Sequence, residues 1–216
     1  MIALIFDMDG VIIDSNPVHR EAWEAYNRRF GVETTDEMHT RMYGKRNDQI
    51  VRDYLGDHLS DEEVLKHGAA KESLFREMIA SRVDEFLVPG LRAFLDRHSD
   101  LRKAVASNAE AANVEFVLKT ADLARHFSVV LDGHQVSNPK PAPDVFLHAA
   151  ELLGAHPQDC VVFEDSYSGV QAGVAAGMKV VGVRTTQGEL PGTSLEVDNF
   201  LSTELEEWLR GVMGAK

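Results

Sequence analysis

Two patterns of hydrophobic and polar residues divide the chain into unlike regions. Between residues 15 and 88 the apolar positions recur at helical spacing, and the first predicted helix ends at Gly31 with an apolar face of Ala22, Trp23, Tyr26 and Phe30. Further helices are predicted over residues 35–42, 47–54, 61–81 and 83–86. Because no strand pattern interrupts this stretch, we expect it to be all-helical.

After Val88-Pro89-Gly90 the pattern changes to short apolar runs separated by helical segments. The runs typical of buried strands cover residues 103–107, 128–131, 161–164 and 179–183. Helices are predicted over 91–97, 109–121, 143–153 and 168–176, and an amphipathic helix over 200–211 closes the chain. Strands that alternate with helices predict an α/β protein with a doubly wound parallel sheet.

One further strand lies at the very start of the chain, where Leu4, Ile5 and Phe6 lead to Asp7. A lone strand before an all-helical stretch has nothing to pair with, so we expect it to join the later strands. The helical stretch is then an insertion. The sequence predicts a core domain of residues 1–14 and 88–216, and a small all-helical domain of residues 15–87.

The composition of the 216 residues is that of an ordinary globular protein, with 44% hydrophobic and 26% charged residues. The formal net charge is −13, and no block of five or more basic residues occurs. Nucleic acid and anionic membranes are therefore poor partners. Nothing in the pattern indicates an obligate protein partner.

The single cysteine, Cys160, cannot form a disulfide within the chain and stands in an apolar run, so we interpret it as a core thiol. The apolar stretch at the N-terminus has no basic residues before it and is broken at Asp7. These features predict neither a signal peptide nor a membrane span, and they favour the reducing cytoplasm.

Asp7 and Asp9 are the first candidates for chemistry, because a short apolar strand stops at these two carboxylates and Gly10 follows. Carboxylates at the carboxyl end of a parallel strand lie where open α/β sheets bind ligands. An isolated Asp-x-Asp is also common in simple turns. Here neighbouring Lys or Arg residues are lacking, so two close like charges favour a bound cation.

Polar residues also follow the next predicted strands. They are Ser107 and Asn108, then Lys140 within a proline-rich loop, then Glu164 and Asp165. Each has a structural alternative: Ser107 and Asn108 could cap a helix, Lys140 could be a solvated loop residue, and the two acids could begin a helix. Random caps would not all fall at one sheet edge, and we therefore favour a joint site. Carboxylates, hydrogen-bond donors and one ammonium together indicate phosphoryl transfer.

These segments carry a resemblance to a known family. They are Phe6-Asp7-Met8-Asp9-Gly10-Val11, Ser107-Asn108, Lys140-Pro141 and Glu164-Asp165-Ser166. Together they resemble the four-motif signature of the haloacid dehalogenase superfamily, in its phosphotransferase branch, and the surrounding residues resemble its β-phosphoglucomutase-like subfamily. The resemblance implies a Rossmann-like core and makes the helical insertion a cap domain.

The resemblance further implies a role for each residue. Asp7 would attack a phosphate monoester and form an aspartyl-phosphate, while Asp9 would protonate the leaving oxygen. Mg²⁺ would be the cofactor, held by the Asp7 carboxylate, the backbone carbonyl of Asp9, Asp165 and, directly or through water, Glu164. Ser107 and Asn108 would bind phosphate, and Lys140 would offset its charge. Dehalogenases lack the second acid, so halide displacement is disfavoured.

The cap residues implied by the resemblance are His19 and the loop residues Lys45, Arg46 and Asn47, in a segment of residues 42–48 that resembles a substrate-specificity loop. The mutases carry an arginine three residues after the glycine of this loop, and this chain has Asn47 there. His19 could instead be a satisfied surface histidine. A shifted basic residue could still bind a second phosphate.

We therefore expect a Mg²⁺-dependent phosphatase for a small phosphorylated metabolite, such as a sugar phosphate. A β-phosphoglucomutase-type reaction ranks second, phosphonate cleavage is a minor alternative, and a non-catalytic phosphate-binding protein of the same fold is the alternative from another class. The physiological substrate, the oligomeric state and the resting position of the cap are not legible in the sequence.

Overall fold

Six strands form one parallel sheet in the computed structural model, which describes residues 2–43 and 45–214. The strands are β1 (Ala3–Phe6), β2 (Arg102–Ala106), β3 (Val129–Leu131), β4 (Cys160–Glu164), β5 (Lys179–Val183) and β6 (Leu195–Val197). Their order is β3-β2-β1-β4-β5-β6, so β1 lies between β2 and β4 and the strand order reverses beside it. The predicted doubly wound parallel sheet is confirmed. A ligand site is expected at this reversal, at the carboxyl ends of the strands.

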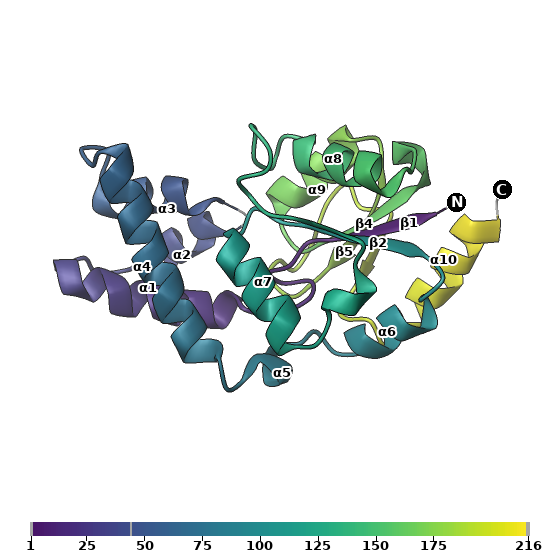
Figure 1. Ribbon diagram of the computed structural model, residues 1–216, viewed down its shortest axis with the longest axis horizontal. Helices are drawn as coiled ribbons and strands as arrows, with labels where there is room; N and C mark the ends of the chain where they lie inside the picture. The colour runs from purple at the N-terminus through teal and green to yellow at the C-terminus, as the bar shows by residue number, and fades with distance from the viewer. Residues whose placement is uncertain (1, 44, 215–216) are drawn as a thin grey trace.

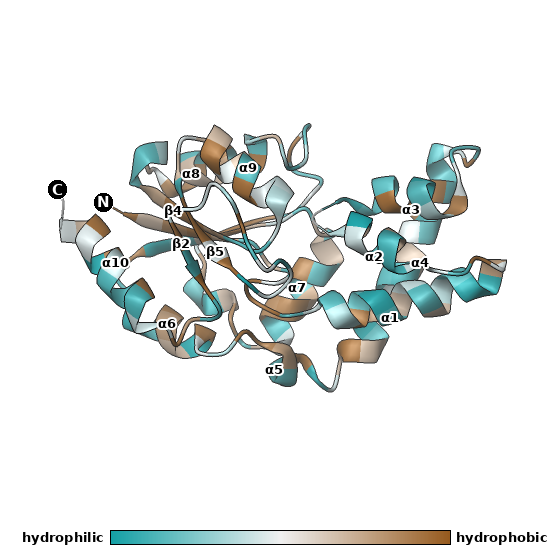
Figure 2. Ribbon diagram, turned by 180° about the vertical axis from the view of Figure 1, so that it is seen from behind, coloured by the Kyte–Doolittle hydropathy of each residue, from teal (hydrophilic) through white to brown (hydrophobic). Residues whose placement is uncertain are grey.

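Helices cover both faces of the sheet (Figure 1). One face carries α8 (Asp144–Leu153) and α9 (Tyr167–Ala175), and the other carries α6 (Leu91–Arg97), α7 (Ala111–Thr120) and α10 (Thr203–Gly214). Short 3₁₀ helices occupy Ala124–His126 and Pro157–Asp159. Because both faces are covered, the strands are apolar on both sides, and Figure 2 shows them as a hydrophobic centre.

Side chains alternate between the two faces along each central strand. Ala3 and Ile5 pack toward α8, whereas Leu4 and Phe6 pack toward α6. Phe6 stacks on Phe163 of β4 at a centroid distance of 4.6 Å. Cys160 is fully buried, as predicted for a core thiol.

The inserted helices form a group of their own beyond the sheet (Figure 1). They are α1 (Asn16–Asn27), α2 (Asp36–Met42), α3 (Asn47–Leu55), α4 (Asp61–Ile79) and α5 (Val83–Phe86). A separate hydrophobic cluster around Trp23 and Val51 joins α1, α2, α3 and α4, whereas Val83 of α5 belongs to the core cluster of the sheet. The chain leaves and returns side by side, because the Asp14 amide donates to the Phe86 carbonyl at 2.7 Å. The domain boundaries at residues 14/15 and 87/88 stay a prediction.

Some local details differ from the sequence-based expectation. The first helix ends at Asn27, and a 3₁₀ turn over Arg28–Phe30 leads to Gly31 at φ +71°. Phe30 is therefore 50% exposed and does not belong to the buried face. The strand β6 was not predicted, since it has only three residues and one of them is the charged Glu196.

The aromatic contacts of Phe6 yield a stability prediction. Replacing Phe6 by Ala removes the fully buried ring that stacks on Phe163, so we expect Phe6→Ala to lower the free energy of unfolding by about 3–5 kcal/mol in a urea titration. Phe30→Ala is the matched control, with an expected loss below about 1 kcal/mol. Equal losses in the two variants would contradict the burial assigned to both rings.

Candidate active site

Asp7 and Asp9 stand at the carboxyl end of β1 but face different surroundings. The Asp7 amide still donates to the Phe163 carbonyl of β4 at 3.0 Å, which keeps residue 7 at the sheet edge. Gly10 turns the chain at φ +79°, and a Cβ on it would lie 1.9 Å from an oxygen of Asp165. Glycine is therefore required at this close approach.

Lys140 lies at the centre of the site and is 4% exposed. Its Nζ donates to Asp7 Oδ1 at 2.8 Å, to Glu164 Oε1 at 2.7 Å and to the Ala106 carbonyl at 3.0 Å. It also lies 4.6 Å from the centroid of the Phe146 ring. The alternative of a solvated loop lysine is thereby excluded.

Glu164 and Asp165 turn their carboxylates toward this site, although a helix does begin nearby. The helix cap is Ser166, whose Oγ accepts from the Gly169 amide at 3.1 Å. Glu164 is fully buried, and its Oε2 accepts from the amides of Asp165 at 2.9 Å and Ser166 at 3.0 Å. A Cβ on Gly169 would lie 1.8 Å from Glu164, so the helix leaves room for this carboxylate.

Three carboxylates gather here around a single ammonium. Oxygens of Asp7, Glu164 and Asp165 lie within 4.8 Å of one another. Burial raises the pKa of Asp7 to about 7, against the lowering effect of Lys140. Burial, together with the charges of Glu164 and Asp7, also raises the pKa of Asp165 well above its usual range. A hard divalent cation with oxygen ligands, such as Mg²⁺, fits this excess of negative charge.

Ser107 and Asn108 follow β2, next to Asp7. The Ser107 Oγ accepts from the Ala109 amide at 3.1 Å, and the Asn108 Oδ1 accepts from the Lys140 amide at 3.3 Å. Neither caps the next helix, because the N-cap residue of α7 is Glu110. The capping alternative is therefore wrong, and both side chains stay at the sheet edge.

The Asp9 carboxylate faces the inserted helices instead of the carboxylate cluster formed by Asp7, Glu164 and Asp165. Ser15 Oγ hydrogen-bonds to Asp9 Oδ1, and His19 Nε2 lies 3.4 Å from the same oxygen. His19 is therefore placed against Asp9 and is not a surface histidine. The proposed contribution of the Asp9 backbone carbonyl to a metal stays a prediction.

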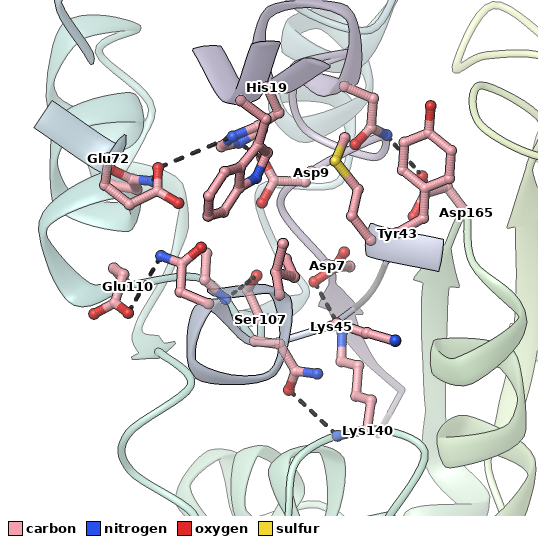
Figure 3. A pocket seen from close by; sticks show the side chains of 18 of the residues that line it. Asp7, Asp9, His19, Tyr43, Lys45, Glu72, Ser107, Glu110, Lys140 and Asp165 are labelled. Atoms are coloured by element: carbon pink, nitrogen blue, oxygen red, sulfur yellow. Dashed lines mark hydrogen bonds and ion pairs between the residues drawn. The ribbon is translucent and has the colours of Figure 1, made fainter. Parts of the chain in front are cut away.

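One cavity joins the sheet edge to the inserted helices (Figure 3). Nearly all the predicted site residues line it, namely Asp7, Asp9, His19, Lys45, Asn47, Ser107, Asn108, Lys140, Glu164 and Asp165. The exception is Arg46, whose guanidinium lies 3.4 Å from His134 Nδ1 outside this lining. Within the predicted specificity loop, Gly44 lies outside the described residues.

Two cavity residues on the inserted segment already have partners. Lys45 Nζ donates to Asp53 Oδ2 at 2.6 Å, and Asn47 Nδ2 donates to Glu110 Oε1 at 3.4 Å. The second contact joins the inserted helices to the start of α7. Glu110 therefore adds a carboxylate to the wall of the cavity, away from the carboxylate cluster.

Comparison with known proteins agrees with this geometry. A family model described as haloacid dehalogenase-like hydrolase matches residues 1–177. The chain belongs to this family. No helix in the described part of this haloacid dehalogenase-like hydrolase is long and apolar enough to cross a membrane.

Several relatives cover nearly the whole chain. It is 34% identical to fructose-1-phosphate phosphatase YqaB of Escherichia coli over 84% of this chain and 95% of that protein. It is 29% identical to the β-phosphoglucomutase of Bacillus subtilis over 96% of both chains. The crystal structure of β-phosphoglucomutase from Clostridium difficile superposes with a TM-score of 0.87 at 25% identity, over the full length of both chains.

Residues that the sequence analysis did not single out also lie in the wall of this hydrolase's cavity or beside it. Thr186 hydrogen-bonds to Asp165 and follows β5, so the rule of polar residues after strands would have found it. Lys71 and Glu72 lie on the buried face of α4 between Gly68 and Phe75. The sequence did contain a signal for these two residues, because charged residues at positions of an otherwise apolar helix face are seldom buried without a specific role.

The carboxylate cluster predicts a measurable metal effect. We expect Mg²⁺ to raise the thermal unfolding midpoint of the wild-type protein, because a ligand that binds only the folded state stabilises it. Asp165→Asn removes one carboxylate of the cluster and should abolish the rise in midpoint, as measured by scanning calorimetry at increasing Mg²⁺ concentrations. The exposed Asp57→Asn is the control and should keep the rise. An undiminished rise in Asp165→Asn would contradict the assignment.

Proposed function

We propose that this protein is a Mg²⁺-dependent phosphatase that hydrolyses a small phosphate monoester, a sugar phosphate or a similar metabolite, through an aspartyl-phosphate. One observation carries the proposal. Asp7 lies beside the carboxylates of Glu164 and Asp165 and accepts a hydrogen bond from Lys140. Asp9, two residues later, instead contacts His19. A nucleophile and a proton donor need these separate surroundings.

In the first step an oxygen of Asp7 attacks phosphorus and the bond from phosphorus to the ester oxygen breaks. The proton of Asp9 passes to that leaving oxygen. In the second step Asp9 takes a proton from water, and the resulting nucleophile releases phosphate from Asp7. Ser107 and Asn108 would donate hydrogen bonds to phosphate oxygens, and Lys140 would offset charge on Asp7 and the transferring group.

Mg²⁺, when bound, would withdraw electron density from the phosphate oxygens and screen the approach of Asp7. Asp7, Asp165 and Glu164 are the side chains that would hold it, together with the Asp9 carbonyl. We also propose that residues 15–87 act as a cap over the core of residues 1–14 and 88–216. His19, Lys45 and Asn47 support this division, because they reach the cavity from the inserted helices.

The relatives support a phosphorylated carbohydrate as the substrate class. One is named a fructose-1-phosphate phosphatase, and a relative from Thermotoga maritima that is 32% identical is named a phosphorylated carbohydrates phosphatase. A polar wall with Tyr43, Asn47 and Glu110 suits the hydroxyl groups of such a molecule.

A β-phosphoglucomutase reaction is the second candidate, favoured by the relative of that name from Bacillus subtilis. A mutase must hold a second phosphate, which needs a second cation. Among the described cavity residues, Lys45 is paired with Asp53, Lys71 with Glu72, and Lys140 with the sheet edge. Hydrolysis of a monophosphate therefore ranks first. A non-catalytic binding protein ranks lowest, because both the nucleophile and the acid are in place.

The nucleophile can be tested directly. We expect Asp7→Asn to abolish turnover and the trapping of fluoroberyllate, because an amide oxygen cannot form the acyl phosphate. Phosphate release from p-nitrophenyl phosphate with and without Mg²⁺ measures the first effect, and fluorine NMR the second. Asp57→Asn should retain both. Full activity in Asp7→Asn would contradict the mechanism, and an absence of metal-dependent turnover in wild type between about pH 5 and 9 would favour a binding protein.

A substrate panel separates hydrolysis from mutase activity. The panel contains fructose 1-phosphate, β-glucose 1-phosphate and glucose 6-phosphate, with β-glucose 1,6-bisphosphate added as a primer in parallel reactions. We expect phosphate release to exceed isomerisation for every compound, because the cavity cations are already paired. Formation of glucose 6-phosphate faster than phosphate release would instead assign the mutase reaction.

A further inference from the structure

A charged pair is buried in the middle of α4, on the side that faces the core. Lys71 is 1% exposed and Glu72 is 4% exposed, and Lys71 Nζ donates to Glu72 Oε1 at 2.6 Å. Lys71 also lies 4.8 Å from the centroid of the Trp23 ring. Burial would favour the protonated acid, but the charge of Lys71 and the hydrogen bonds from Lys71 and Asn113 lower the pKa of Glu72 to about 2. The pair is thus a fixed pair of opposite charges in the cavity wall.

The pair is connected to the core domain by one buried side chain. Asn113 of α7 donates from Nδ2 to Glu72 Oε2 at 2.6 Å, and its Oδ1 accepts from Arg76 of α4 at 2.6 Å. Asn113 is 1% exposed. Both amide atoms of one core residue are therefore bonded to α4, and the bonds exist only while α4 lies against α7.

The other end of the network reaches Asp9. Lys71 Nζ lies 3.1 Å from His19 Nδ1, and an ammonium can only donate, so Nδ1 carries the lone pair and Nε2 the hydrogen. That Nε2 lies 3.4 Å from Asp9 Oδ1. The ring is further held by stacking on Phe75, with centroids 3.8 Å apart. The imidazole N–H is therefore aimed at the carboxylate that moves the proton.

We propose that Glu72 and Asn113 are positioning residues for Asp9, acting through Lys71 and His19. This inference rests on the proposed phosphatase function. If α4 separates from α7, Asn113 no longer holds Glu72, and the Lys71 ammonium loses its fixed place beside His19. A buried charge whose partner is displaced is unfavourable. The arrangement with α4 packed on α7 is therefore favoured over the arrangement in which the two helices are separated.

The leaving group provides the test. A sugar alkoxide needs the proton from Asp9 in order to leave, whereas p-nitrophenolate leaves without one. The measured quantity is the kcat for the best sugar phosphate of the panel divided by the kcat for p-nitrophenyl phosphate. Two variants are compared with wild type. Glu72→Gln weakens the hold on Lys71, and Asn113→Asp keeps the acceptor for Arg76 but cannot donate to Glu72. Glu77→Gln, exposed on the same helix, is the matched control.

We expect this ratio to fall about tenfold or more in both variants, a part of the roughly 10²–10⁴-fold that a general acid contributes, with KM for the sugar phosphate changing less than kcat. Glu77→Gln should stay within about twofold of wild type, as expected for an exposed position. Thermal unfolding midpoints show whether each variant is folded. If Glu72→Gln does not fold, the result for Asn113→Asp decides the test.

Equal losses on both substrates, or no loss, would overturn the positioning role while leaving the phosphatase proposal intact. Failure of the Asn113 variant to fold would make the network purely structural and would overturn the role as well. Absence of Asp7-dependent turnover in wild type would instead contradict the proposed function itself.

Discussion

The site depends on one buried ammonium. Lys140 bonds to Asp7 after β1, to the Ala106 carbonyl at the end of β2 and to Glu164 at the end of β4, so it joins the carboxyl ends of three adjacent strands. Two buried carboxylates could not lie this close without a cation between them. The same contacts leave Asp165 as the acid without an ammonium, which supports the proposal that these carboxylates hold a divalent metal.

The division of work between Asp7 and Asp9 follows from this arrangement and from the turn at Gly10. Asp7 stays in register with β4 and shares its charge with Lys140, whereas Asp9 is directed to the inserted helices. In the mechanism that we propose, the nucleophile Asp7 is therefore fixed by the sheet, and the acid Asp9 by groups on the inserted helices. Under the same proposal, the chemistry of Asp9 depends on the position of the inserted helices, whereas that of Asp7 depends on the sheet.

The sequence was most informative where chemistry is tied to strand ends. Asp7, Ser107, Lys140 and Glu164 were found because parallel strands gather their carboxyl ends at one edge. Residues whose role depends on contacts between distant segments, such as Asn113 against Glu72, have no local signature. Two other predictions depended on local backbone geometry that the sequence does not reveal. Arg46 lies in a loop and contacts His134 outside the cavity lining, and Phe30 lies in a 3₁₀ turn that exposes its ring. β6 escaped detection because three residues are too few for a strand pattern.

The charge of the protein bears on which phosphate ester can enter. A net charge of −13 repels anions at long range, but salt screens such fields within roughly 8 Å at physiological ionic strength. Attraction must therefore be local, from Lys140 and from the Mg²⁺ that we propose is held by Asp7, Glu164 and Asp165. The far wall offers no unpaired cation to a second phosphate among the described cavity residues, because Lys45 is paired with Asp53 and Glu110 adds a carboxylate. A molecule with one phosphate and an uncharged, hydroxylated remainder matches this arrangement, whereas a second phosphate would meet a carboxylate.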